Sequence, residues 1–143
     1  MTIFYSTELA GIASTPVVKA SATAGYGARL RRYRATITLA SQATTDTIMV
    51  AMVPAGLTFA YGVLTTSVTL GTSTVAIGVT GTTAKYKASG TFTAVDTPTM
   101  FGVNTAVGQA ALTAEDQVFI TIGTAALPAS GTLVVDLYFS TPT

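Results

Sequence analysis

Short runs in which apolar and polar residues alternate recur along this chain from Arg29 onward, and they constrain its fold more than any other feature. In the run QVFITIG, Val118, Ile120 and Ile122 occupy every second position. Successive side chains of a β-strand point to opposite faces of the sheet, so a period of two is typical of a half-buried strand. No convincing amphipathic helix accompanies these runs. The chain is therefore predicted to be all-β.

The runs follow one another at fairly regular spacing and are separated by turns rich in Gly, Pro, Ser and Thr. The strands expected from them are Arg29–Leu39, Asp46–Val53, Leu57–Thr66, Thr72–Val79, Thr82–Ala88, Gln117–Gly123 and Thr132–Ser140, with short pieces inside Thr91–Gly108. About eight strands joined in this way predict an antiparallel β-sandwich, which we expect to be jelly-roll-like. The run from Asp46 to Val53 is strongly apolar, so we expect a central place in its sheet.

Residues 1–28 differ from the rest of the chain, because they are rich in Ala, Ser, Thr and Gly and show no sustained periodicity. Such a segment is either a disordered tail or an extended arm that lies against a neighbouring subunit. Phe4, Tyr5, Leu9 and Ile12 slightly favour the arm, since a fully solvated tail has no use for large apolar side chains. We therefore divide the chain into an extended N-terminal arm, 1–28, and a single β-sandwich domain, 29–143.

The chain carries few charges. Charged residues make up 9% of its 143 residues, with a net charge of +1, whereas soluble domains average about 25%. A Thr-coated monomer and a subunit covered by its partners both fit this composition. The second is favoured, because a net charge near zero promotes association. A homo-oligomer is therefore expected.

The composition argues against catalysis. The chain has no His and no Cys, so an imidazole base, a thiolate nucleophile and a cysteine-bound metal are excluded. The six carboxylates show neither the facing pair of a glycosidase nor the spacing of a calcium loop. We expect no enzymatic activity, no catalytic residues, no cofactor and no metal site. Membrane insertion is not expected, because no stretch of about 18 apolar residues occurs.

The basic residues are concentrated at the start of the first expected strand, at Arg29, Arg31, Arg32 and Arg34. Residues 1–34 contain five basic residues and one acidic residue, a net charge of +4, and the remainder contains two and five, a net of −3. Three interpretations remain open: a solvated strand edge, a contact with the carboxylates of a partner subunit or capsid, and nucleic-acid binding. Nucleic acid is the least expected partner, because the rest of the chain is slightly acidic. The candidate partner-binding residues are these four arginines together with Phe4 and Tyr5.

Three segments carry a resemblance to a known class of proteins. They are the strand–PAG–strand segment Val50–Phe59, TLGTSTVAIG at Thr69–Gly78, and ASGTLVVDLYFS at Ala129–Ser140. Together they span about residues 46–140. This region resembles small structural proteins of tailed-phage virions, most of all the decoration, or cement, proteins on the outside of the head. The resemblance implies a β-sandwich, often a trimer, that clamps neighbouring capsid subunits. It carries no binding residues over position by position.

Residues and resemblance together predict a non-enzymatic virion protein on the surface of a phage head, assembled in the host cytoplasm. It is expected to bind the major capsid protein as a homo-oligomer, with a trimer as the expected state, and to stabilise the head lattice. Two alternatives remain open. The chain could be a tail or fibre component, or a β-sandwich binding module that recognises a host glycan.

Overall fold

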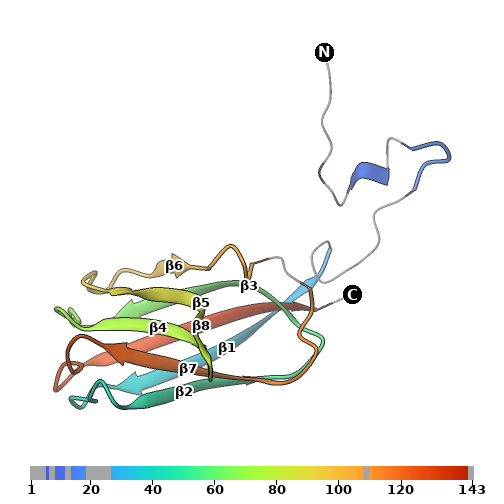
Figure 1. The fold of residues 1–143 in the computed structure, drawn as a ribbon. Helices are drawn as coiled ribbons and strands as arrows, with labels where there is room; N and C mark the ends of the chain where they lie inside the picture. The colour runs from blue at the N-terminus through green and yellow to red at the C-terminus, as the bar shows by residue number, and fades with distance from the viewer. Residues whose placement is uncertain (1–5, 7–8, 12–13, 19–26, 108–109, 142–143) are drawn as a thin grey trace.

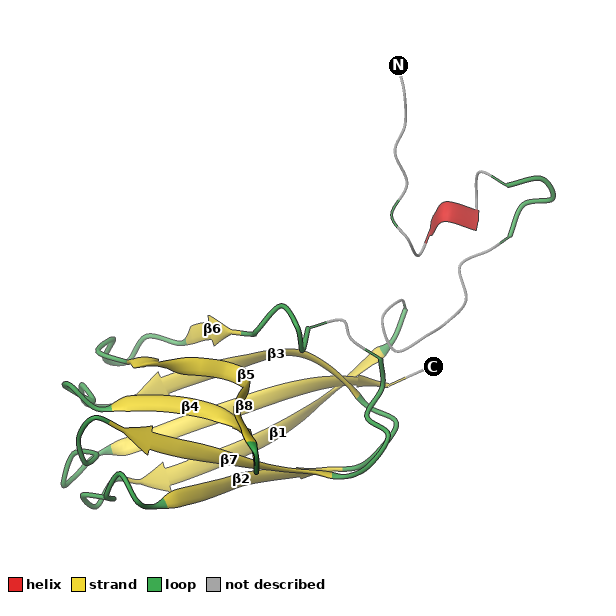
Figure 2. Ribbon diagram, viewed as in Figure 1, coloured by secondary structure: helices red, strands yellow, loops and turns green. Residues whose placement is uncertain are grey.

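The computed structural model describes residues 6, 9–11, 14–18, 27–107 and 110–141, and the described residues form eight β-strands (Figure 1). The strands are β1 (Arg29–Thr38), β2 (Thr47–Val53), β3 (Thr58–Thr66), β4 (Thr74–Val79), β5 (Thr82–Thr91), β6 (Thr99–Phe101), β7 (Asp116–Gly123) and β8 (Thr132–Thr141). One short helical turn, at residues 9–11, is the only helix within the described ranges (Figure 2).

The strands form two four-stranded sheets that pack face to face. The first sheet has the order β1-β8-β3-β6 and the second has the order β2-β7-β4-β5. Every pair of neighbouring strands is antiparallel, and the pairs are nested: β1 pairs with β8, β2 with β7, β3 with β6 and β4 with β5. Such nesting is jelly-roll-like. The prediction of an all-β antiparallel sandwich with about eight strands is confirmed.

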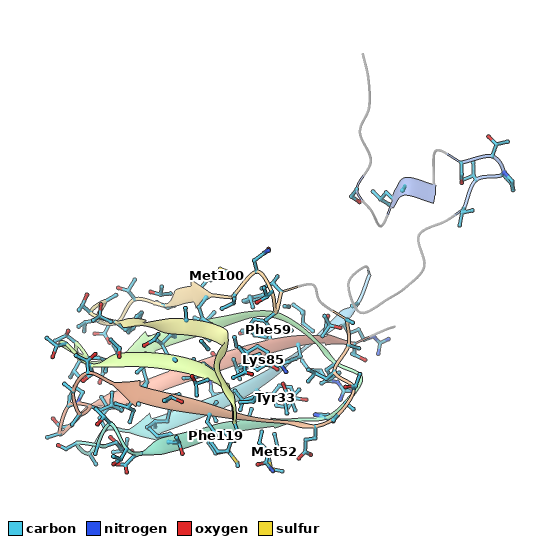
Figure 3. The ribbon with its side chains drawn as sticks, in the orientation of Figure 1. Tyr33, Met52, Phe59, Lys85, Met100 and Phe119 are labelled. Carbon is cyan, nitrogen blue, oxygen red and sulfur yellow. The ribbon has the colours of Figure 1, made fainter. Side chains whose placement is uncertain are left out.

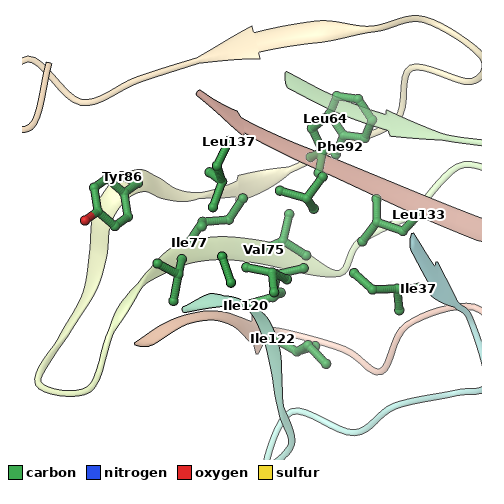
Figure 4. Packing of buried hydrophobic residues seen from close by; sticks show 14 of the residues in the cluster. Ile37, Leu64, Val75, Ile77, Tyr86, Phe92, Ile120, Ile122, Leu133 and Leu137 are labelled. Atoms are coloured by element: carbon green, nitrogen blue, oxygen red, sulfur yellow. The ribbon is translucent and has the colours of Figure 1, made fainter. Parts of the chain in front are cut away.

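The core lies between the two sheets and is built from the alternating positions seen in the sequence. On β7, Val118, Ile120 and Ile122 are buried, and the residues between them are more exposed. On β8, Leu133 and Leu137 are buried in the same way and belong to the same cluster (Figure 4). Burial of one such side chain contributes about 1.5–3 kcal/mol. The apolar face of each strand therefore stabilises the sandwich.

Aromatic rings fill the part of the core around Phe139. Its ring makes edge contacts with Tyr33 at 5.8 Å, with Phe59 at 5.4 Å and with Tyr86 at 5.7 Å between centroids. Figure 3 shows Tyr33 and Phe59 between the two layers of strands. These rings come from four different strands, so they join β1, β3, β5 and β8 in one packed unit.

The expected central position of residues 46–53 is wrong, because β2 is an edge strand of the second sheet. Val50, Ala51 and Val53 are buried, but Met49 and Met52 are exposed. The run is apolar because both of its faces carry apolar side chains, and only one of these faces is covered by the core. Sequence pattern alone attributes such a run to burial on both sides.

Candidate interaction surfaces

The four arginines singled out in the sequence all lie on β1, which is an edge strand of the first sheet, and all four are exposed. They do not share one face. Arg32 and Arg34 lie on the outer face of the sheet, whereas Arg29 and Arg31 occupy the alternate positions at the start of the strand. Phe4 and Tyr5 lie outside the described residues.

Arg34 is engaged within the molecule. Its Nε donates to Oδ1 of Asp136 at 2.8 Å, and its Nη2 donates to Oδ2 of the same carboxylate at 2.6 Å. Asp136 stands opposite Arg34 on β8 and is only 6% exposed. The hydrogen bonds from Arg34 hold the pKa of the Asp136 carboxyl below its usual range, against the opposing effect of burial. Arg29, Arg31 and Arg32 are therefore the arginines that a partner could use.

Exposed arginines and two exposed aspartates lie at opposite ends of β1, while the exposed Glu115, just before β7, lies at the arginine end. Arg29 pairs with Thr141, at the end of β8. Asp46 lies in the turn that follows β1, at the opposite end of that strand. Asp96 also lies at this opposite end, where its amide donates to the carbonyl of Thr66. We call the end with Arg29, Arg31 and Arg32 the basic end and the end with Asp46 and Asp96 the acidic end.

The outer face of the first sheet carries an aromatic patch. Tyr61 of β3 and Tyr138 of β8 stand opposite each other, and their rings stack at 4.6 Å with an interplanar angle of 18°. Val63 and Met100 continue the patch toward β6, and Met100 is 67% exposed. We call Tyr61, Val63, Met100 and Tyr138 the aromatic face. Sequence reasoning did not find it, because β3 and β8 are far apart in the chain and their register is not readable from it.

The outer face of the second sheet carries a different patch. Met49 of β2 stands opposite Phe119 of β7, and Met52 stands opposite Gln117. Met49 is 48% exposed and Met52 is 51% exposed. We call Met49, Met52, Gln117 and Phe119 the methionine face. Figure 3 shows Met52 and Phe119 at one border of the sandwich and Met100 at the other.

A hollow of about 210 Å³ adjoins the methionine face. It is lined by Phe119 and by threonines and small residues of β2, β7 and the β4–β5 turn: Thr47, Val79, Thr80, Gly81, Thr83 and Thr121. Gly78 makes this arrangement possible, because a Cβ there would lie 2.2 Å from the carbonyl oxygen of Thr82. The β4–β5 turn therefore rests directly on the sheet and forms one wall of the hollow.

A larger cavity, of about 360 Å³, lies beside a small charged cluster. Lys85 donates to Asp116 at 2.5 Å, and the hydroxyl of the buried Tyr86 donates to the same carboxylate oxygen. Burial, and then this hydrogen bond, raise the pKa of Tyr86 well above its usual range. Asp116 thus ties β5 to β7. Its hydrogen bonds to two donors give it a structural role in joining the strands.

The described residues hold no group of three or more His, Asp, Glu or Cys that could bind a metal ion. Within the same ranges, no helix is long and apolar enough to cross a membrane.

No family model matches the chain, and no curated protein matches it by sequence. Solved structures do match its fold. A chain of the capsid asymmetric unit of cyanophage Pam1 is similar with a TM-score of 0.69 and 17% identity, over 90% of this chain and 96% of that one. A chain of the capsid of Ralstonia phage GP4 is similar with a TM-score of 0.60 and 16% identity, over 94% and 95% of the two chains.

A third similar chain belongs to an acid-stable capsid of the Helicobacter pylori bacteriophage KHP30. It has a TM-score of 0.58 and 13% identity, over 80% of this chain and 89% of that one. All three structures are phage capsids, so the resemblance to phage virion proteins seen in the sequence is confirmed at the level of the fold.

Proposed function

We propose that this chain is a non-enzymatic virion structural protein that binds the outside of a phage capsid and stabilises the head lattice. It binds as a homo-oligomer, and the expected oligomer is a trimer. One observation carries the proposal: its fold is shared, over nearly its whole length, with chains found in phage capsids.

The lengths of the matched chains support an accessory role. The similarity covers 96% of the cyanophage chain and 95% of the Ralstonia phage chain. These capsid chains are therefore single sandwiches of about this size, and not domains within a larger shell protein. A small sandwich of this kind is suited to binding across an existing lattice.

The basic end is the surface that we assign to the capsid. Arg29, Arg31 and Arg32 are exposed there, and the N-terminal arm joins the sandwich at the same end. Arginine forks suit carboxylates on a partner. Each contact contributes little alone, but contacts linked within one oligomer act together through their effective concentration. The major capsid protein is the proposed partner, and the head surface is the proposed location.

Binding to heads that lack this protein tests the assignment. The variant Arg29→Ser, Arg31→Ser, Arg32→Ser removes three positive charges at the basic end. Its matched control adds three negative charges near the acidic end at exposed threonines: Thr44→Glu, Thr45→Glu and Thr72→Glu. Both variants lower the net charge by three, so the comparison separates a loss of binding at the basic end from an effect of net charge alone.

Cosedimentation with heads should fall at least about tenfold for the arginine variant and for a chain that lacks residues 1–28. The threonine variant should bind like the wild type. Binding that survives both the truncation and the loss of the arginine charges contradicts the assignment of the basic end.

The stacked Tyr61–Tyr138 pair favours a second candidate, a tail or fibre component that recognises a host glycan. Partly exposed aromatic rings present flat apolar faces. Under this candidate, a glycan array gives a signal that Tyr61→Ala abolishes, and heads are not bound. A silent array together with bound heads excludes it.

A further inference from the structure

We propose that the methionine face is the surface through which copies of this chain associate. This inference rests on the proposed function, because it assigns a surface to the homo-oligomer named there. The occupant is a second copy of this chain, and three features of the structure support that choice.

The first feature is the edge of the second sheet. Three of the four edge strands are protected against pairing with another chain: β1 carries four arginines, β5 carries Lys85 and Lys87, and β6 has only three residues. The fourth, β2, is seven residues long, carries no charge and exposes two methionines. An edge of this kind is a liability in a free monomer and is safe where another subunit covers it.

The second feature is the absence of charge. The outer face of the first sheet includes Arg32, Arg34 and Asp136 beside its aromatic rings. No Asp, Glu, Lys or Arg is among Met49, Met52, Gln117, Phe119 and the residues that line the hollow. Residues that lie next to a rotation axis come close to the same residues of the other copies. An uncharged patch meets its own copy with no like-charge repulsion, whereas the outer face of the first sheet would bring Arg32 close to the same residue of another copy.

The third feature is a shape that suits a methionine. The hollow of about 210 Å³ lies beside Phe119, which itself stands opposite Met49. A methionine side chain is flexible and makes favourable contacts with aromatic rings, so it fills irregular spaces of this kind. Methionine and phenylalanine are also enriched at protein–protein interfaces, where charged residues are depleted at the centre. We therefore place Met49 or Met52 of one copy at the hollow of the next.

Light scattering behind a sizing column, on the full chain at micromolar concentration, tests the proposal with three proteins. They are the wild type, Met52→Glu, and Met100→Glu as the matched control on the aromatic face. Both methionines are exposed in the single chain, at 51% and 67%. The wild type and Met100→Glu should have the same mass, a multiple of the 14.5 kDa chain. Met52→Glu should have the mass of one chain and an unchanged circular dichroism spectrum.

A monomeric wild type overturns the proposal, and so does an oligomer that Met100→Glu breaks and Met52→Glu does not. If Met52→Glu fails to fold, the neutral pair Met49→Thr, Met52→Thr decides the matter, since threonine suits a strand surface. That pair should raise the dissociation constant at least about tenfold. An unchanged constant overturns the proposal.

Head binding is measured on the same samples, so the two claims fail separately. A wild type that binds heads as a monomer keeps the proposed function and removes this inference. A wild type that oligomerises through Met52 without binding heads keeps this inference and removes the proposed function. If Met52→Glu keeps the oligomeric mass of the wild type but no longer binds heads, then the methionine face contacts the capsid. That result also overturns the inference.

Discussion

Arg34 and Asp136 form a two-pronged ion pair between neighbouring strands: the guanidinium donates to both carboxylate oxygens, at 2.8 Å and 2.6 Å. The pair joins the edge strand β1 to β8 and is part of the outer face of the sheet. Asp136 is nevertheless almost fully buried. The hydrogen bonds from Arg34 therefore replace water at a carboxylate that is shielded from solvent. They also hold β1, the strand that carries the basic end, against β8.

The first prediction concerns this ion pair. Asp136→Asn should lower the melting temperature at pH 7 by about 2–5 °C. Arg34 holds the pKa of Asp136 below its usual value, so the pair contributes stability that is full above about pH 4. This contribution is lost as the pH falls through the lowered pKa.

Thermal melts from pH 7 to pH 2 check this. The difference in melting temperature between the wild type and Asp136→Asn should shrink below about pH 4. A difference that stays constant down to pH 2 contradicts the assigned role of the pair.

The second prediction compares two leucines of the same sheet. Leu137 is 1% exposed and belongs to the core, whereas Leu30 is 53% exposed on the outer face. Leu137→Ala should reduce the free energy of unfolding by about 2–5 kcal/mol, because it leaves a cavity. Leu30→Ala should change it by less than about 0.5 kcal/mol. Urea denaturation measures both, and equal effects would mean that the core is misplaced.

The third prediction concerns the contact between the β4–β5 turn and the sheet. A Cβ at Gly78 would meet the backbone of Thr82 and Thr83, whereas a Cβ at Gly90 on β5 has its nearest neighbour at 4.0 Å. Gly78→Ala should therefore cost about 1–3 kcal/mol of unfolding free energy. Gly90→Ala, the same chemical change, should stay within about 0.5 kcal/mol. Chemical denaturation of both variants decides whether the turn rests on Gly78.

The fourth prediction concerns alkaline pH. Burial raises the pKa of Tyr86, so the folded chain resists its ionisation while the unfolded chain ionises it near pH 10. The stability that this group contributes is complete below pH 10 and falls as the pH rises above it. Tyr86→Phe should remove the part of the alkaline loss of stability that comes from this hydroxyl. Urea midpoints between pH 8 and pH 11.5 check this, and parallel curves for the two proteins would contradict it.

The strands could be predicted from the sequence because their period depends only on neighbouring residues. The alternation in 117–123 and 132–140 matches β7 and β8 closely. The position of β2 could not be predicted in this way. Met49 and Met52 look like core residues in the sequence, and only the strand order shows that they lie on an uncovered face.

The candidate surfaces were predictable only in part. A run of arginines is visible in any sequence, but the partner of Arg34 is Asp136, which becomes its neighbour only through the register of β1 and β8. The Tyr61–Tyr138 stack and the Met49–Phe119 pair have the same origin. Surfaces built across strands depend on pairing between distant segments, and a period of two carries no information about that pairing.

The central claim is that this chain binds the outside of a phage head, and electron cryomicroscopy tests it most directly. Heads prepared from a phage that lacks the gene are mixed with the purified chain and imaged beside untreated heads. The account predicts added density, of the size of the sandwich, at regularly repeated positions on the outer surface. Heads that remain bare at saturating concentrations of the chain would contradict it.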